Sequence, residues 1–329
     1  MPANLTPQYH KAEEAYKKAT TAEERLACLK QMYTQLPKHK GTEKLQADLK
    51  TKMAEAKEAI EQEKKAPKGG VSYKIQSQGA GQVVLLGPPN VGKSLILKRL
   101  TKATPEVAAY PFTTREPQPG MMAWEDVFVQ LVDLPPITPD YLEAWQGNLI
   151  RGADLALLVV GLADDDGATR TLEAVTKLAE IKTHLDTGPT RLSDDGRERF
   201  IKTLLVANQA DVADADLRLE LLRAAVGQRW PLIVVSAETG AGMEELRTAI
   251  YQSLGVIRVY TKQPGKPADR TSPFTCPQGS TVIDLAGIIH RDLLASFKSA
   301  RIWGTGVFDG QTVKRDHVLN DGDIVEIHT

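Results

Sequence analysis

The chain has few of the features that mark secreted, membrane-spanning or metal-rich proteins. Its 329 residues include only two cysteines, Cys28 and Cys276. These two match no metal-binding or redox spacing, so we expect reduced thiols. No apolar run approaches the roughly 18 residues of a membrane span. The first residues lack a basic segment followed by an apolar one, so no secretory signal is visible. These absences predict a soluble, cytoplasmic protein with no membrane partner.

An excess of charge of either sign is also missing. The formal net charge is -1 and aromatic residues make up 5% of the chain. Overall charge therefore provides no attraction toward nucleic acid or acidic membranes. The length is sufficient for two or three domains with a central core of ordinary size.

Residues 1–70 predict a helical module that ends in a linker. Lys, Glu, Ala and Leu dominate, and helical spacing recurs over 12–19, 22–36 and 42–63. The segment is mildly basic, with 14 Lys and Arg residues against 10 Asp and Glu. It is interpreted either as a contact surface for RNA or a partner protein, or as a solvated amphipathic hairpin. Because aromatic residues are scarce, the hairpin is the favoured interpretation.

Residues 71–255 alternate short apolar runs with amphipathic segments, which predicts an α/β domain with a mainly parallel sheet and helices on both faces. In such sheets the ligand lies at the carboxyl ends of the strands. Between the third strand and the fourth, residues 161–203 have room only for a helix and a loop. The predicted strands are 83–86, 127–132, 155–160, 204–207 and 232–235, and the predicted helices are 95–100, 171–185, 214–226 and 243–254.

Residues 256–329 predict a small α+β domain. Short strands at 257–260 and 324–327 bracket one helical stretch at 282–297, and turn signals separate the remaining segments.

A phosphate-binding loop is predicted where the first strand meets the first helix of the α/β domain. Residues 87–94 read Gly-Pro-Pro-Asn-Val-Gly-Lys-Ser, and strand, glycine loop and helix follow in the order that such a loop requires. Backbone N–H groups would surround the β-phosphate. Lys93 would reach the β- and γ-phosphates, and the Ser94 hydroxyl would bind Mg²⁺. The residues predicted to contact the phosphates are Pro88, Pro89, Asn90, Val91, Gly92, Lys93, Ser94 and Leu95.

Polar residues at two later strand ends select the base. Asp211 ends the segment Asn208-Gln209-Ala210-Asp211, and one carboxylate accepts both the N1–H and the exocyclic amine of guanine. Adenine presents an acceptor at N1, so an ATPase would require Asp211 to be idle. Asn208 would brace the loop, and Ser236-Ala237-Glu238 would supply a backbone N–H to the guanine carbonyl.

Asp133, at the end of the predicted strand 127–132, provides a carboxylate that would hold Mg²⁺ through water. Between it and the loop, residues 110–115 read Tyr-Pro-Phe-Thr-Thr-Arg, and we take Thr114 rather than Thr113 to close over the metal. The predicted metal site is Ser94, Thr114 and Asp133, and the predicted catalytic residues are Lys93 and Thr114.

Together these motifs resemble the Obg/DRG group of translation-factor-class GTPases. Residues 256–329 resemble the TGS domain, a ubiquitin-like β-grasp module, through Ile257-Arg258-Val259-Tyr260, Trp303-Gly304 and Asp323-Ile324-Val325. The resemblance covers nearly the whole chain. It implies that the protein binds GTP and GDP, hydrolyses GTP, and associates with ribosomes, RNA or regulatory proteins. The implied order is a helical module at 1–70, a P-loop GTPase domain at 71–255 and a TGS domain at 256–329.

The chain departs from that pattern at two positions, Pro136 and Gln209, and from many other GTPases at a third, Ile137. Pro136 replaces the glycine whose N–H donates to the γ-phosphate, which predicts weak discrimination between GTP and GDP. Gln209 replaces the lysine whose stem covers the base. Ile137 lies where many GTPases have a water-orienting glutamine, and the resembled group shares this change. Asn90 then has two open interpretations, as a marker of a K⁺ ion near the phosphates or as a loop-stabilising residue.

Two functions of different classes remain from the sequence. One is a Mg²⁺-dependent GTPase with slow intrinsic turnover. The other is a nucleotide-binding scaffold with little hydrolysis, in which the flanking modules bind the partner.

Overall fold

The computed structural model describes residues 22–36, 49, 51–53, 73, 75–101 and 116–329. It separates into two units, Met1–Ser72 and Tyr73–Thr329. In the first unit, α2 (Ala22–Gln35) is followed by Leu36, and Leu29, Met32, Leu36 and Leu49 form a small buried cluster. The helix predicted at 12–19, and most of the one predicted at 42–63, lie outside the described residues.

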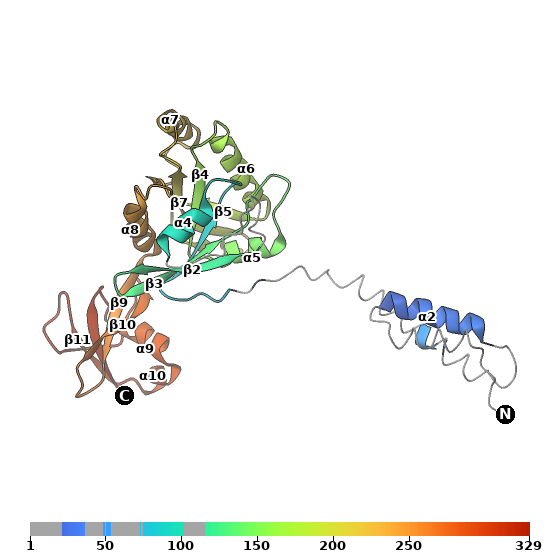
Figure 1. The fold of residues 1–329 in the computed structure, drawn as a ribbon. Helices are drawn as coiled ribbons and strands as arrows, with labels where there is room; N and C mark the ends of the chain where they lie inside the picture. The colour runs from blue at the N-terminus through green and yellow to red at the C-terminus, as the bar shows by residue number, and fades with distance from the viewer. Residues whose placement is uncertain (1–21, 37–48, 50, 54–72, 74, 102–115) are drawn as a thin grey trace, which may run out of the picture. The chain divides into compact units, whose positions relative to one another are not determined.

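The second unit contains an eight-stranded sheet (Figure 1). Its strand order is β2-β3-β1-β4-β7-β5, and β6 and β8 also pair with β7. The pairs β2–β3 and β6–β7 are antiparallel and the other pairs are parallel, so the predicted mainly parallel sheet is confirmed. The strands are β1 (Gln82–Leu86), β2 (Gln118–Trp124), β3 (Val127–Asp133), β4 (Leu155–Gly161), β5 (Thr183–Asp186), β6 (Arg191–Leu192), β7 (Arg199–Asn208) and β8 (Leu232–Val234).

Helices cover both faces of this sheet because its central strands are apolar on both sides. Alternate residues of β1 divide between two cores: Val84 and Leu86 belong to one, and Val83 and Leu85 to the other. The first core includes α5 (Ala144–Gly152), α6 (Gly167–Glu180) and α7 (Ala215–Val226), whereas the second includes α4 (Lys93–Leu100) and α8 (Met243–Leu254). Burial on both faces leaves the strand ends as the place where polar side chains gather.

Residues 161–203 differ from the sequence prediction. Helix α6 ends at Glu180 instead of continuing to Leu185, and two strands, β5 and β6, follow it before β7. Lys182 takes a left-handed backbone with φ 57°, which ends the helical path. Leu185 is buried in the core as a strand residue, so its helical spacing from Leu178 was misleading.

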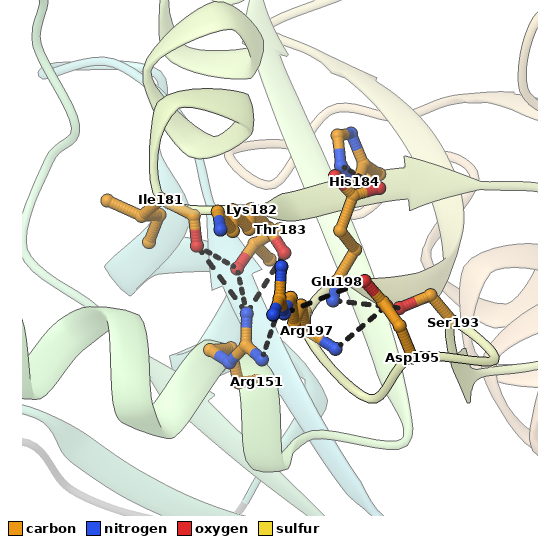
Figure 2. Close-up of polar contacts among 9 residues, drawn as sticks. All are labelled: Arg151, Ile181, Lys182, Thr183, His184, Ser193, Asp195, Arg197 and Glu198. Atoms are coloured by element: carbon orange, nitrogen blue, oxygen red, sulfur yellow. Dashed lines mark hydrogen bonds and ion pairs between the residues drawn. The ribbon is translucent and has the colours of Figure 1, made fainter.

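Figure 2 shows the polar contacts that connect this segment with α5 and within the turn before β7. Arg151, in the last turn of α5, donates to the carbonyl oxygens of Lys182 at 2.9 Å and Arg197 at 3.3 Å. In the turn before β7, Asp195 accepts from the Ser193 hydroxyl at 2.6 Å and from the Arg197 N–H at 3.1 Å. The β5–β7 edge is therefore bonded to α5.

A second, five-stranded sheet has the order β10-β9-β13-β11-β12. Strands β9 and β13 are parallel and the remaining pairs are antiparallel, and α9 supplies Val282 and Leu285 to its core. The two sheets confirm the predicted fold class, whereas the boundaries at 70 and 255 stay predictions. The elements are β9 (Val256–Lys262), β10 (Ala268–Pro277), α9 (Val282–Ile289), α10 (Arg291–Ser296), β11 (Ser299–Trp303), β12 (Gln311–Val313) and β13 (Asp323–His328).

The prediction of one continuous helix over 282–297 is wrong, because the structure has two helices there, α9 and α10. The helical path breaks at His290, whose ring Nδ1 accepts the N–H of Asp292 at 3.2 Å and so caps α10. None of the helices in the described parts of the chain is both long and apolar enough to cross a membrane.

Candidate functional site

The loop between β1 and α4 is held close to two neighbouring strand ends. Gly87 has φ 144° and Gly92 has φ 84°. A Cβ atom on Gly87 would lie 2.4 Å from the Val159 carbonyl oxygen, and one on Gly92 would lie 2.3 Å from Asn208 Nδ2. Both positions therefore require glycine for conformational and steric reasons.

Lys93 is the first residue of α4, and its amine lies under the loop. The residue is 6% exposed, and Nζ donates to the carbonyl oxygens of Gly87 at 3.1 Å and Pro88 at 2.9 Å. Burial lowers the pKa of Lys93 to about 8, while the charge of Asp133 acts in the opposite direction. A desolvated ammonium of this kind is stabilised by a bound anion.

Asp133, at the end of β3, lies beside the start of the same helix. The Ser94 hydroxyl donates to its Oδ2 at 2.5 Å, whereas Oδ1 is buried without a partner among the described residues. Burial raises the pKa of Asp133, and the Ser94 hydrogen bond and the Lys93 charge oppose that rise. A buried carboxylate with an unused oxygen next to a hydroxyl is a donor set that fits Mg²⁺. Thr113 and Thr114 lie outside the described residues.

Asn208, at the end of β7, connects the phosphate loop with the end of β8. Its Nδ2 donates to the Val91 carbonyl at 2.8 Å, and its Oδ1 accepts the Ala237 N–H at 2.9 Å. The side chain is buried. The bracing role predicted for Asn208 has this geometry.

Asp211 and Gln209, which follow Asn208 in the same loop, also bond to neighbouring segments. The Ser236 hydroxyl donates to Asp211 Oδ1 at 2.5 Å. Gln209 adopts a left-handed backbone with φ 68°, and its Nε2 donates to the Asn90 carbonyl at 3.3 Å. The predicted base-reading and phosphate-binding segments are thus connected by direct hydrogen bonds.

The segment after β3 also rests against the loop. The Ile137 N–H donates to the Gly87 carbonyl at 3.2 Å. The buried Gln146 side chain of α5 donates to the Pro135 carbonyl at 3.0 Å. Between these contacts, Pro136 has no N–H to offer a phosphate.

Sequence reasoning missed two residues of this site, Gln146 and Arg99. Arg99 of α4 donates from Nε to the Ala237 carbonyl at 2.8 Å, and its Nη2 bonds to the Glu238 carbonyl. The Ala237 carbonyl that Arg99 bonds to lies 138 residues away along the chain. Spacing alone carries no signal for such a contact.

Comparison with known proteins gives a family match to part of the first sheet and to the second sheet. Residues 82–192 match the family described as 50S ribosome-binding GTPase, and residues 257–329 match the TGS domain. An uncharacterized GTP-binding protein of Halobacterium salinarum is 28% identical, covering 93% of this chain and 98% of that protein. Developmentally-regulated G-protein 1 of Arabidopsis thaliana is 29% identical, covering 88% of this chain and 87% of that protein.

A solved structure, the G domain of the FeoB iron transporter of T. maritima, is similar at 26% identity. It covers 52% of this chain and 97% of that one, with a TM-score of 0.36. The chain is a GTP-binding protein with a GTPase domain of the 50S ribosome-binding family and a C-terminal TGS domain, similar over most of its length to developmentally regulated GTP-binding proteins.

Proposed function

We propose that this protein binds GTP and GDP with Mg²⁺ and hydrolyses GTP slowly. The observation that carries the proposal is the contact of Ser94 with Asp133 directly beside the buried amine of Lys93. Lys93 and the loop N–H groups would stabilise charge on the leaving phosphate, where positioned donors have their largest effect. Ser94, Thr114 and, through water, Asp133 would hold Mg²⁺, which neutralises phosphate charge when bound.

Guanine specificity is assigned to the loops after β7 and β8. Asp211 would accept from the guanine N1–H and amine, and Ser236 holds one of its oxygens by a 2.5 Å hydrogen bond. Gln209 would cover part of the base, as its contact with the Asn90 carbonyl supports.

Single-turnover hydrolysis of GTP by the full chain tests this proposal. We expect measurable phosphate release that Lys93→Ala abolishes, and GTP and GDP binding that ATP does not compete with. Phosphate release by the wild type no faster than by Lys93→Ala would overturn it.

A nucleotide-binding scaffold with little hydrolysis is the second candidate. It is favoured by Pro136, which has no N–H, and by Ile137, whose N–H donates to Gly87. As arranged, neither group is available to a third phosphate. Tight GTP binding without single-turnover hydrolysis would support this candidate over the first.

Activation by K⁺ is proposed from Asn90. Its backbone is left-handed, with φ 63°, on the loop that would surround the phosphates. K⁺ near that position would supply positive charge in place of an arginine. Equal turnover in K⁺ and Na⁺ would leave Asn90 with its loop-stabilising role alone.

A cytoplasmic role at the ribosome, or with RNA or a regulatory protein, is proposed for the flanking modules. It is supported by the family description of the GTPase domain and by the TGS match. Co-sedimentation of the full chain with ribosomes, in GTP and in GDP, tests this part. Absence from the ribosome pellet with either nucleotide would contradict a ribosomal partner.

A further inference from the structure

The three consecutive peptide groups that join residues 236 to 239, after β8, are called the base-reading loop. Nearly every backbone polar group in these peptides has a protein partner. The Ser236 carbonyl accepts from the Gly240 N–H at 2.8 Å, and the Ala237 N–H donates to Asn208 Oδ1 at 2.9 Å. The Thr239 N–H donates to the Ser236 hydroxyl at 3.0 Å. These bonds fix the first and the last peptide of the loop.

The middle peptide joins Ala237 to Glu238. Its carbonyl oxygen accepts from Arg99 Nε at 2.8 Å, and the same guanidinium bonds to the next carbonyl, that of Glu238. Its N–H, that of Glu238, has no acceptor within the described parts of the chain. Because a peptide is planar and trans, holding the carbonyl also fixes the direction of this N–H.

We propose that Arg99 is a positioning residue for guanine recognition, which aims the Glu238 N–H at the carbonyl oxygen of the base. The inference rests on the proposed nucleotide site and goes beyond it by naming the donor and the residue that orients it. Arg99 is suited to this role because its planar fork can bond two carbonyls at once. Arg99 also connects α4, whose first residues are Lys93 and Ser94, with the base-reading loop.

A purely structural role for Arg99 predicts a different result from a positioning role. General loosening of the loop would weaken every guanine nucleotide equally. If only the direction of the Glu238 N–H were lost, the affinity would fall mainly for ligands that have a strong hydrogen-bond acceptor at the carbonyl position of the base.

Calorimetric titration of the full chain with GDP and with 6-thio-GDP, in Mg²⁺, distinguishes the two. The thio compound keeps the N1–H and amine that Asp211 would read but presents sulfur, a weaker acceptor. We expect the wild type to prefer GDP, and Arg99→Ala to weaken GDP binding by roughly three- to tenfold, the range of one neutral hydrogen bond. Its affinity for 6-thio-GDP should change by less than about twofold, so the preference is largely lost.

Arg247→Ala is the matched control. Arg247 of α8 also donates to two carbonyls, those of Ala123 at 2.9 Å and Leu100 at 3.3 Å, and within the described parts of the chain none of its hydrogen bonds reaches the base-reading loop. It should leave both affinities unchanged. Arg99→Lys, which keeps the charge but not the fork, should lie between Ala and the wild type.

An equal loss of both ligands in Arg99→Ala, or no loss of either, would overturn the positioning role. If Arg99→Ala does not fold, Arg99→Lys decides by the same ratio. Failure of the wild type to bind GDP would instead reject the proposed nucleotide site, so the two failures are distinguishable.

Discussion

At Lys93, burial and a neighbouring charge act in opposite directions on one amine. Burial lowers the pKa to about 8, and the nearby Asp133 opposes this effect. A bound polyphosphate favours the protonated amine, so nucleotide binding should be accompanied by proton uptake above pH 8. The same depressed pKa means that the unfolded chain binds more protons than the folded one between about pH 8 and 10.5, so folding stability from this group rises with pH there.

We therefore expect GDP affinity to fall by about eightfold between pH 7.5 and pH 9, because only about a tenth of the amines keep their proton at pH 9. Isothermal titration at a series of pH values measures this. Lys93→Ala should bind weakly throughout and show a much smaller decrease. An unchanged affinity of the wild type at pH 9 would contradict the depressed pKa.

Pro136 provides a second test at the scale of one residue. Replacing it by glycine restores an N–H after β3, so Pro136→Gly should raise the preference for a non-hydrolysable GTP analogue over GDP by about tenfold or more. Pro135→Gly, next to it, is the control for loss of a proline and should leave the ratio unchanged. Equal ratios in all three proteins would show that this position does not sense the third phosphate.

Residues whose chemistry is local could be predicted from the sequence. The positions of Lys93 and Ser94 at the start of α4, and of Asp211 in the loop after β7, could be predicted because strand end, loop and helix start follow one another along the chain, and their roles in nucleotide binding stay predictions. Arg99 and Gln146 could not be predicted, because their carbonyl partners come from other elements and such bonds leave no periodic signal.

At the scale of elements, the strands buried on both faces could be predicted from the sequence, and the edge of the sheet could not. Strands β1 and β4 are continuous apolar runs, and both were found within one residue of their ends. Strand β5 is short and alternates buried with partly exposed residues, and β6 consists of two exposed residues. Arg151 bonds to the residues that precede β5 and β7, and these contacts reach across 31 and 46 residues of chain.

Removing that guanidinium should loosen the edge. We expect Arg151→Ala to lower the free energy of unfolding by about 1–2 kcal/mol, since carbonyl groups of the Lys182 and Arg197 peptides lose a charged donor. Hydrogen exchange should become faster in β5 and in the first half of β7. Arg170→Ala is the control, because Arg170 is 41% exposed and, among the described residues, pairs with the exposed Asp164 and Asp166. Its effect should stay below about 0.5 kcal/mol. Equal exchange in the two variants would remove this role.

At the scale of the whole second unit, the order of the two sheets could be predicted from composition shifts and turn signals, but their contact could not. Arg258 of β9 bonds to Asp126 at 3.0 Å, to Asp321 at 2.7 Å and to Glu125. Tyr260 also bonds to Asp126. The TGS sheet is thereby joined to the turn between β2 and β3, and β3 leads directly to Asp133.

This joint, the contact between β9 and the β2–β3 turn, is formed largely by charged side chains. The hydrogen bond from Arg258 holds the pKa of Asp321 below its usual range. For Asp126, burial raises the pKa, but the hydrogen bonds from Tyr260 and Arg258 outweigh it and the pKa is lowered. Stability from a carboxylate of this kind is fully present above its ordinary pKa and is lost as pH falls through the lowered one. The joint should therefore be intact at neutral pH and fail only in acid.

Because Arg258 bonds to residues on both sides of this joint, its removal should destabilise both β9 and the β2–β3 turn. In Arg258→Ala at pH 7, hydrogen exchange of the full chain should rise by about threefold or more in two separate peptides, one across the β2–β3 turn and one in β9. Arg270→Ala, at an exposed position of the neighbouring strand β10, should change neither. Faster exchange in β9 alone would mean that Arg258 only stabilises the TGS sheet. Faster exchange in both peptides would show that Arg258 stabilises the TGS domain and the β2–β3 turn together. Because β3 ends at the proposed metal site, a partner that binds the TGS domain could then influence that site through this contact.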